Sequence, residues 1–166
     1  MKRLLILILL VFAGCREQTL SETLNSVKDS RTITDRQAET LSKVGTLFLN
    51  SLTSITNEQA ESLSTVKHLQ LNSLTSITDQ QAERLSEVQI LQLNGLTTIT
   101  DQLAESLSKV EGTLHLNGLT TITDQQAESL SKFGTLSLNG LSSITDEQAE
   151  SLGKVESLSL HGLTSI

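Results

Sequence analysis

Histidines and carboxylates are the residues of this chain that could do acid–base or metal chemistry. The histidines are His68, His115 and His161, and the carboxylates recur four residues apart, as in Asp35 with Glu39, Asp79 with Glu83 and Asp124 with Glu128. Catalysis requires unlike groups that converge on one point, whereas these groups recur at regular intervals. Carboxylates at that spacing suit helix capping and solubility. We therefore expect no enzymatic activity, no metal site and no cofactor.

The regular interval is a feature of the whole sequence. Isoleucines stand at positions 33, 55, 77, 99, 122, 144 and 166, a step of 22 residues that becomes 23 once, where the segment 110–113 carries one extra residue. A fixed period in the twenties is typical of a solenoid, in which each repeat stacks on its neighbours.

Each repeat predicts one short strand, a turn and one short helix. Leucines alternate with other residues in the triplets 47–49, 69–71, 91–93, 114–116, 136–138 and 158–160, as in half-buried strands. The helix then begins with a T-x-x-Q capping box, present as Thr34–Gln37, Thr56–Gln59, Thr78–Gln81, Thr123–Gln126 and Thr145–Gln148. Only Thr100 lacks it, because Leu103 replaces the glutamine. The expected fold is an α/β solenoid with a parallel sheet on one side and helices on the other.

The repeat resembles the leucine-rich repeats over roughly residues 20–166. Val66, Leu69 and Leu71, followed by Leu74 and Ile77, match the family's L-x-x-L-x-L frame, although the family usually has Asn or Cys where Leu74 stands. The L-x-x-I turn is similar to that of the BspA-like bacterial surface proteins. The resemblance implies a right-handed coil, with strands on its concave side and helices on its convex side. It also implies that the concave face binds partners, usually proteins.

Comparison of the repeats with one another separates positions that the fold fixes from positions that it leaves free. The free positions are outward-facing strand residues, and their large side chains are Phe48, His68, Gln70, Ile90, Gln92 and His115. We predict that this patch binds a protein or a polysaccharide. The alternative is that these positions vary because packing does not constrain them. The Asn column at positions 50, 72, 94, 117 and 139 is expected to hydrogen-bond to adjacent turns or to one another, in preference to the alternative that it binds a ligand.

The start of the chain predicts export. Two basic residues precede an apolar run over 4–13, which ends in Gly14 and Cys15. This order is typical of a secretory signal, and about 15 Å of helix is too short to span a bilayer. The segment FAGC resembles the lipobox of bacterial lipoproteins. The resemblance implies a signal peptide over 1–14, a lipid on Cys15 and attachment to a membrane of the cell envelope. Arg16 favours the outer membrane or the cell surface.

The remaining chain divides into a cap and a repeat region. Residues 15–31 are expected to hold the lipidated N-terminus, a linker and a capping helix, because ETLNSV at 22–27 is similar to the helix segment ESLSTV at 61–66. Residues 32–166 hold about six repeats, the last incomplete. Ile166 stands immediately before the next expected helix, so the chain is a fragment, frays there, or associates end to end.

Charge and cysteine content exclude two further classes of function. The formal net charge of −7 repels phosphate backbones, so we predict no binding to nucleic acid. A single cysteine excludes an intramolecular disulfide. The sequence therefore predicts a lipid-anchored, non-enzymatic interaction module. The alternative is a structural spacer, or a fragment of a longer repeat protein whose active domain lies beyond the C-terminus.

Overall fold

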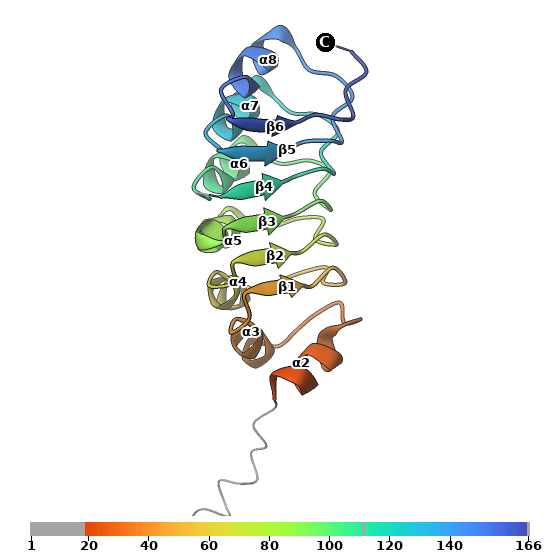
Figure 1. Ribbon diagram of the computed structural model, residues 1–166, viewed down its shortest axis with the longest axis vertical. Coiled ribbons are helices and arrows are strands. Elements are labelled where there is room, and N and C mark those ends of the chain that lie inside the picture. Colours follow the sequence, from red (N-terminus) through yellow and green to blue (C-terminus); the bar gives the residue numbers. More distant parts are fainter. Residues whose placement is uncertain (1–18, 111, 166) are drawn as a thin grey trace, which may run out of the picture.

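Short helices alternate with short strands along the chain, and successive repeats stack in chain order (Figure 1). The computed structural model describes residues 19–110 and 112–165. Within these ranges the helices are α2 (Leu20–Val27), α3 (Asp35–Leu41), α4 (Asn57–Leu63), α5 (Asp79–Arg84), α6 (Asp101–Leu107), α7 (Asp124–Leu130) and α8 (Asp146–Leu152). The strands are β1 (Thr46–Phe48), β2 (His68–Gln70), β3 (Ile90–Gln92), β4 (Thr113–His115), β5 (Thr135–Ser137) and β6 (Ser157–Ser159). A 3-10 turn, η1 (Leu85–Glu87), follows α5. The predicted signal peptide over 1–14, Cys15 and Ile166 lie outside the described residues.

The strands form one parallel sheet whose spatial order follows the chain from β1 to β6. Every neighbouring pair is in register, so that the central leucines make one column: Leu47, Leu69, Leu91, Leu114, Leu136 and Leu158. The extra residue of the segment 110–113 leaves the pairing of β3 with β4 in the same register as the other pairs. The predicted alternation of short strands and helices and the predicted parallel sheet are confirmed.

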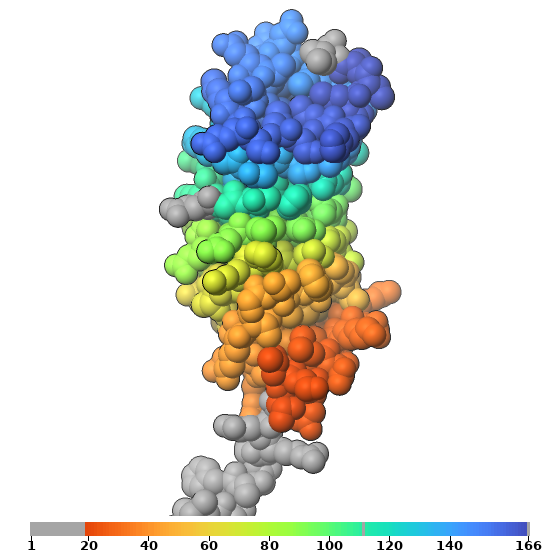
Figure 2. Space-filling view, in the orientation of Figure 1, coloured from red at the N-terminus to blue at the C-terminus, as the bar shows by residue number. Residues whose placement is uncertain are grey.

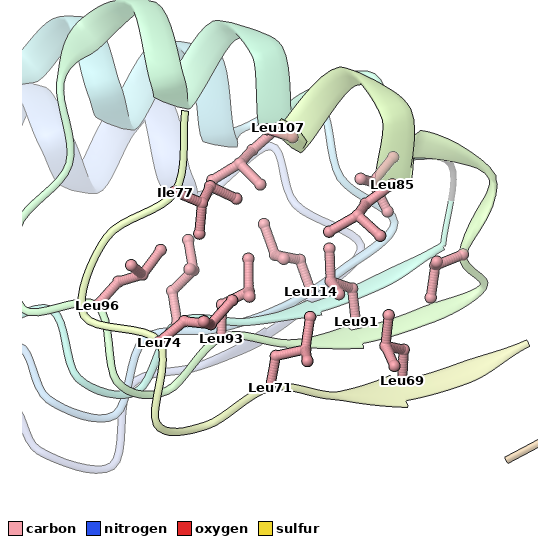
Figure 3. Close-up of a cluster of buried hydrophobic side chains, with 14 of the residues drawn as sticks. Leu69, Leu71, Leu74, Ile77, Leu85, Leu91, Leu93, Leu96, Leu107 and Leu114 are labelled. Carbon is pink, nitrogen blue, oxygen red and sulfur yellow. The ribbon is translucent and has the colours of Figure 1, made fainter. Parts of the chain in front are cut away.

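Leucines from strands, turns and helices fill the space between the sheet and the helices (Figure 3). In the repeat that contains β2, Leu69, Leu71, Leu74 and Leu85 have no exposed surface. Equivalent strand leucines lie one strand spacing apart, about 4.8 Å, so each strand column is continuous from repeat to repeat. Burying one leucine side chain stabilises the fold by roughly 1.5–3 kcal/mol. Because much of that burial is against neighbouring repeats, the repeats stabilise one another.

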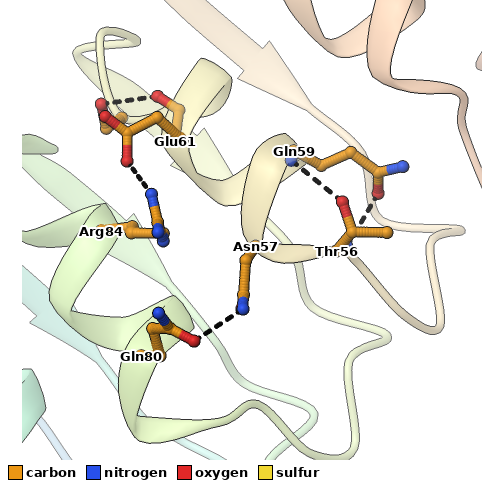
Figure 4. Close-up of polar contacts among 7 residues, drawn as sticks. Thr56, Asn57, Gln59, Glu61, Gln80 and Arg84 are labelled. Atoms are coloured by element: carbon orange, nitrogen blue, oxygen red, sulfur yellow. Dashed lines mark hydrogen bonds and ion pairs between the residues drawn. The ribbon is translucent and has the colours of Figure 1, made fainter.

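Every α-helix of the described residues follows a threonine whose side chain caps it, and the five predicted capping boxes, at α3, α4, α5, α7 and α8, are confirmed. Thr19 caps α2 in the same way, which was not predicted. In α7, Thr123 Oγ1 accepts a hydrogen bond from the backbone N–H of Gln126 at 3.1 Å, and Gln126 Oε1 accepts one from the N–H of Thr123 at 3.0 Å. Figure 4 shows the same pair at α4, formed by Thr56 and Gln59. In α6, Thr100 Oγ1 accepts from the N–H of Leu103, but a leucine side chain cannot return the bond.

The capping glutamines also connect successive repeats, which the sequence analysis did not anticipate. Gln126 Nε2 donates to the carbonyl of Ile99 in the preceding repeat at 3.0 Å and to Asp101 Oδ1 at 2.9 Å. The equivalent carbonyl bonds are made by Gln59, Gln81 and Gln148, at 2.8–3.0 Å. The carboxamide of one glutamine therefore hydrogen-bonds both to a backbone N–H at the start of its own helix and to a backbone carbonyl of the neighbouring repeat.

Helix α2 covers the N-terminal end of the sheet, and it does so in the position of a strand. Ser51 Oγ donates to the carbonyl of Lys28 at 3.2 Å, and in the next repeat Ser73 Oγ donates in the same way to the carbonyl of Asn50. Lys28 therefore corresponds to Asn50, which follows β1. The helix that precedes Lys28 takes the place of a strand, although its sequence is similar to the helical half of a repeat.

The two ends of the core differ in burial. At the α2 end, Val27 is 3 % exposed and Leu47 of β1 is 2 % exposed. At the β6 end, Leu158, Leu160 and Leu163 are only partly buried against the core. Within the described residues, the layer beneath β1 is therefore covered by α2, and the layer beneath β6 is the more open one.

Candidate binding surface

Alternation along the strands creates a surface that faces away from the helices. It consists of the first and third residue of each strand and the residue two positions beyond the strand, and we call it the outer sheet face. Its residues are Thr46, Phe48 and Asn50; His68, Gln70 and Asn72; Ile90, Gln92 and Asn94; Thr113, His115 and Asn117; Thr135, Ser137 and Asn139; and Ser157, Ser159 and His161. The space-filling view shows the successive repeats as bands along one elongated body (Figure 2).

The structure brings all six predicted binding residues together on this face. The strand register places Phe48, Gln70, Gln92 and His115 in one row across β1 to β4, and His68 beside Ile90 in the parallel row. Neighbours within a row are about 4.8 Å apart. The ring of Phe48 is 61 % exposed. His68 is also exposed, and the other four side chains are half-buried. The six residues therefore form one contiguous patch on four adjacent strands.

The asparagines of the outer sheet face form a ladder along the stack. The backbone N–H of each donates to the Oδ1 of the asparagine one repeat earlier: Asn72 to Asn50 at 3.3 Å, Asn94 to Asn72 at 3.2 Å, Asn117 to Asn94 at 2.9 Å and Asn139 to Asn117 at 2.9 Å. In the last repeat the N–H of His161 donates to Asn139 Oδ1 at 2.9 Å. The predicted hydrogen bonding between adjacent turns is confirmed.

The ladder also fixes the orientation of each carboxamide. A backbone N–H can only donate, so the side-chain atom that faces it must be the oxygen. The Nδ2 group then lies on the other side of the carboxamide. Asn50 Nδ2 donates to Gln70 Oε1 at 3.2 Å and Asn139 Nδ2 donates to Ser137 Oγ at 3.1 Å. From the sequence, a structural role was favoured over ligand binding for these asparagines. The orientation of their donors was not predicted, although the strict recurrence of the asparagines was the available signal.

The outer sheet face carries none of the chain's Asp, Glu, Lys or Arg residues. This is notable because 19 % of the residues are charged and the net charge is −7. Its most buried titratable group is the His115 imidazole, and that burial lowers the pKa of His115 below its ordinary value. His115 is therefore neutral at neutral pH. Its neighbours in the row, Gln92 and Ser137, are uncharged as well.

The ion pairs of the described residues lie instead on the helix side. Ion pairs join Arg84 to Glu61 and Lys109 to Glu83, the second at 2.5 Å, and Figure 4 shows the first. The hydrogen bond to Glu83 raises the pKa of Lys109. Hollows lie beside these pairs where α5 gives way to η1, with Ser86 and Glu87 in their walls. Exposed pairs of this kind contribute little to stability, with a median of roughly 0–1 kcal/mol.

The described residues contain no group of three or more His, Cys, Asp or Glu side chains that could hold a metal ion. Among the same residues, no helix combines the length and the apolar character needed to cross a membrane. No family model matches the sequence, and no curated protein matches it. The geometry of the outer sheet face therefore carries the functional argument.

Proposed function

We propose that this protein is a leucine-rich-repeat solenoid that acts as a non-enzymatic interaction module, and that it binds a partner through the outer sheet face. The partner is a protein or a polysaccharide. The observation that carries the proposal is the contiguous patch of Phe48, His68, Gln70, Ile90, Gln92 and His115 on adjacent strands. In a right-handed coil of such repeats the outer sheet face is the concave side, where a partner contacts several repeats at once.

Exposure of Phe48 supports this proposal over drift at unconstrained positions. Among the described residues, Phe48 and Leu24 are the exposed large apolar residues, and Phe48 is the more exposed, at 61 %. Aromatic residues are enriched at interaction sites relative to the rest of a protein surface. The neighbouring Gln and His side chains supply donors and acceptors beside the ring. An aromatic anchor surrounded by polar groups is the arrangement that small contact surfaces use for affinity and orientation.

A lipid on Cys15 completes the proposal. The basic start, the apolar run and the FAGC segment support cleavage before Cys15, lipidation of its thiol and attachment to the outer membrane or cell surface. The test is the intact mass of the mature protein, purified from the membranes of cells that make it. A species that begins at a diacylated or triacylated Cys15 is the expected result. An unprocessed or unlipidated N-terminus contradicts the anchor but leaves the binding surface untouched.

A structural spacer is the second candidate, and the regularity of the ladders favours it. The Asn bonds recur at every repeat boundary from β1 to β6, and the Gln bonds recur at most of the helix boundaries. Such repetition sets the length and stiffness of a body whether or not its face binds anything. A spacer makes no use of the identity of Phe48 or His115.

The two candidates differ in one binding experiment. The mature chain over 15–166, made without the predicted signal peptide and carrying Cys15→Ser so that it cannot be lipidated, is sedimented with washed envelopes of the cells that make the protein. We expect Phe48→Ser combined with His115→Ser to abolish co-sedimentation, because both side chains lie in the patch. Leu24→Ser on α2 is the matched control, since Leu24 is also exposed, at 39 %. Equal co-sedimentation of all variants, or none by the parent, contradicts the binding module and favours the spacer.

A further inference from the structure

The outer sheet face combines two properties that restrict what it can bind. It has no Asp, Glu, Lys or Arg, and it presents a row of oriented amide donors. The Oδ1 atoms of Asn72, Asn94 and Asn117 are held by the backbone N–H groups of the next repeats at 2.9–3.2 Å. No hydrogen bond is made by the Nδ2 groups of these three residues within the described part of the chain.

These three donors lie beside the predicted patch. Asn72 follows Gln70, Asn94 follows Gln92 and Asn117 follows His115, so each donor lies on the same face as the larger side chain of its strand. The spacing between the donors is that of the strands, about 4.8 Å. Because the ladder already fixes the carboxamides, a ligand gains their hydrogen bonds without ordering them first.

We propose that the outer sheet face binds an uncharged polysaccharide, a ligand class that rests on the binding function proposed above. Its hydroxyl, ring and glycosidic oxygens accept hydrogen bonds from the Nδ2 groups of Asn72, Asn94 and Asn117. The exposed ring of Phe48 packs against the apolar face of one sugar ring. Gln70 and Gln92 add donors and acceptors for further hydroxyls.

Other ligand classes fit this face less well. A basic segment finds no carboxylate on it, and an acidic polymer finds no cation and meets a chain of net charge −7. An apolar segment would cover the Nδ2 groups and leave buried donors without acceptors, which is costly. A hydroxyl-rich, uncharged chain satisfies the donors and requires no opposite charge.

The test is calorimetric titration of the full chain with purified oligosaccharides. The uncharged probes are oligomers of glucose, mannose, galactose and N-acetylglucosamine, and the charged probes are oligogalacturonate and oligolysine. The informative variant is Asn94→Asp, because a carboxylate oxygen still accepts the N–H of Asn117 while the Nδ2 donor is lost. We expect at least one uncharged oligosaccharide to bind, and Asn94→Asp to weaken that binding by about tenfold.

The matched control is Asn57→Asp at the start of α4. It introduces the same charge on the helix side, and aspartate occupies this position in other repeats, as at Asp79 and Asp124. We expect the control to bind like the parent. Equal weakening by the two variants, or equal binding of a charged probe, overturns the proposal.

The oligosaccharide titration and the envelope experiment can fail independently of each other. If no uncharged probe binds at millimolar concentration, the ligand class is wrong. The binding module itself survives that result where the envelope experiment with Phe48→Ser and His115→Ser still shows loss, and the ligand is then a protein. If neither experiment shows binding, both proposals fail.

Discussion

Asn94 allows the structural role of the asparagine ladder to be measured apart from any role in binding. Its Oδ1 is the acceptor for the backbone N–H of Asn117 at 2.9 Å, and both residues are half-buried. Asn94→Ala removes that acceptor and leaves a partly buried N–H unpaired, which costs roughly 1–3 kcal/mol. Because water still reaches part of the site, we expect about 1–2 kcal/mol. Asn94→Asp keeps an oxygen in the same place, so its stability is expected to stay close to that of the parent.

The assay is equilibrium unfolding in urea, followed by far-ultraviolet circular dichroism. The alanine variant is expected to unfold at a lower urea concentration than the parent with an unchanged slope, and the aspartate variant at nearly the parent's concentration. Amide hydrogen exchange at Asn117 gives a local readout, and we expect faster exchange in the alanine variant alone. Equal destabilisation by alanine and aspartate would refute the argument, since an intact acceptor would then contribute nothing.

Three further perturbations test the core, the helix caps and the half-buried His115. Leu91→Ala leaves a cavity at a fully buried position and is expected to cost about 2–5 kcal/mol in urea unfolding, whereas Leu24→Ala at an exposed position is expected to cost far less. Gln126→Leu removes the acceptor for the Thr123 N–H and a donor to the preceding repeat. We expect the free energy of unfolding to fall by about 1–2 kcal/mol. An unchanged urea midpoint would contradict a stabilising role of the Gln126 side chain. Because burial lowers the pKa of the His115 imidazole, this imidazole binds a proton more readily in the unfolded chain than in the folded one. Stability is therefore expected to fall as pH drops through and below about 6.5, and His115→Gln should remove this part of the decline.

Local rules were sufficient to predict most of the fold. The capping boxes start the helices at the predicted threonines, and alternation gives the strands at the predicted triplets. Both depend on residues close together in the chain. Leu103 was predicted to break its capping box, and it does, while α6 still forms. Thr100 Oγ1 still accepts the backbone N–H of Leu103, so half of the capping pair remains, and the Leu103 side chain is buried, at 5 % exposed.

The placement of α2 shows where local rules were not enough. Counting 22 residues back from β1 puts the segment 24–26 in the position of a strand. A capping box of Thr19 and Glu22 nevertheless starts a helix there. The sequence indicated the helix but not its position, because position depends on contacts with the next repeat, such as the bond from Ser51 to Lys28.

The candidate surface was likewise predicted in part. Strand alternation identified Phe48, Gln70 and Gln92 as outward-facing, and the register then made them neighbours. The free Nδ2 groups could not be predicted from composition, because an asparagine carboxamide has two possible orientations. The in-register stacking of the repeats selects one of them.

Chemical-shift mapping tests most directly whether the outer sheet face is the binding surface. Isotope-labelled protein is titrated with the uncharged oligosaccharide that binds best, or with the soluble partner that the envelope experiment identifies. We expect the side-chain amide resonances of Asn72, Asn94 and Asn117 and the backbone amides of β1 to β4 to shift together, with those of α3 to α7 unmoved. Shifts confined to the helices, with the asparagine side chains unchanged, would contradict it.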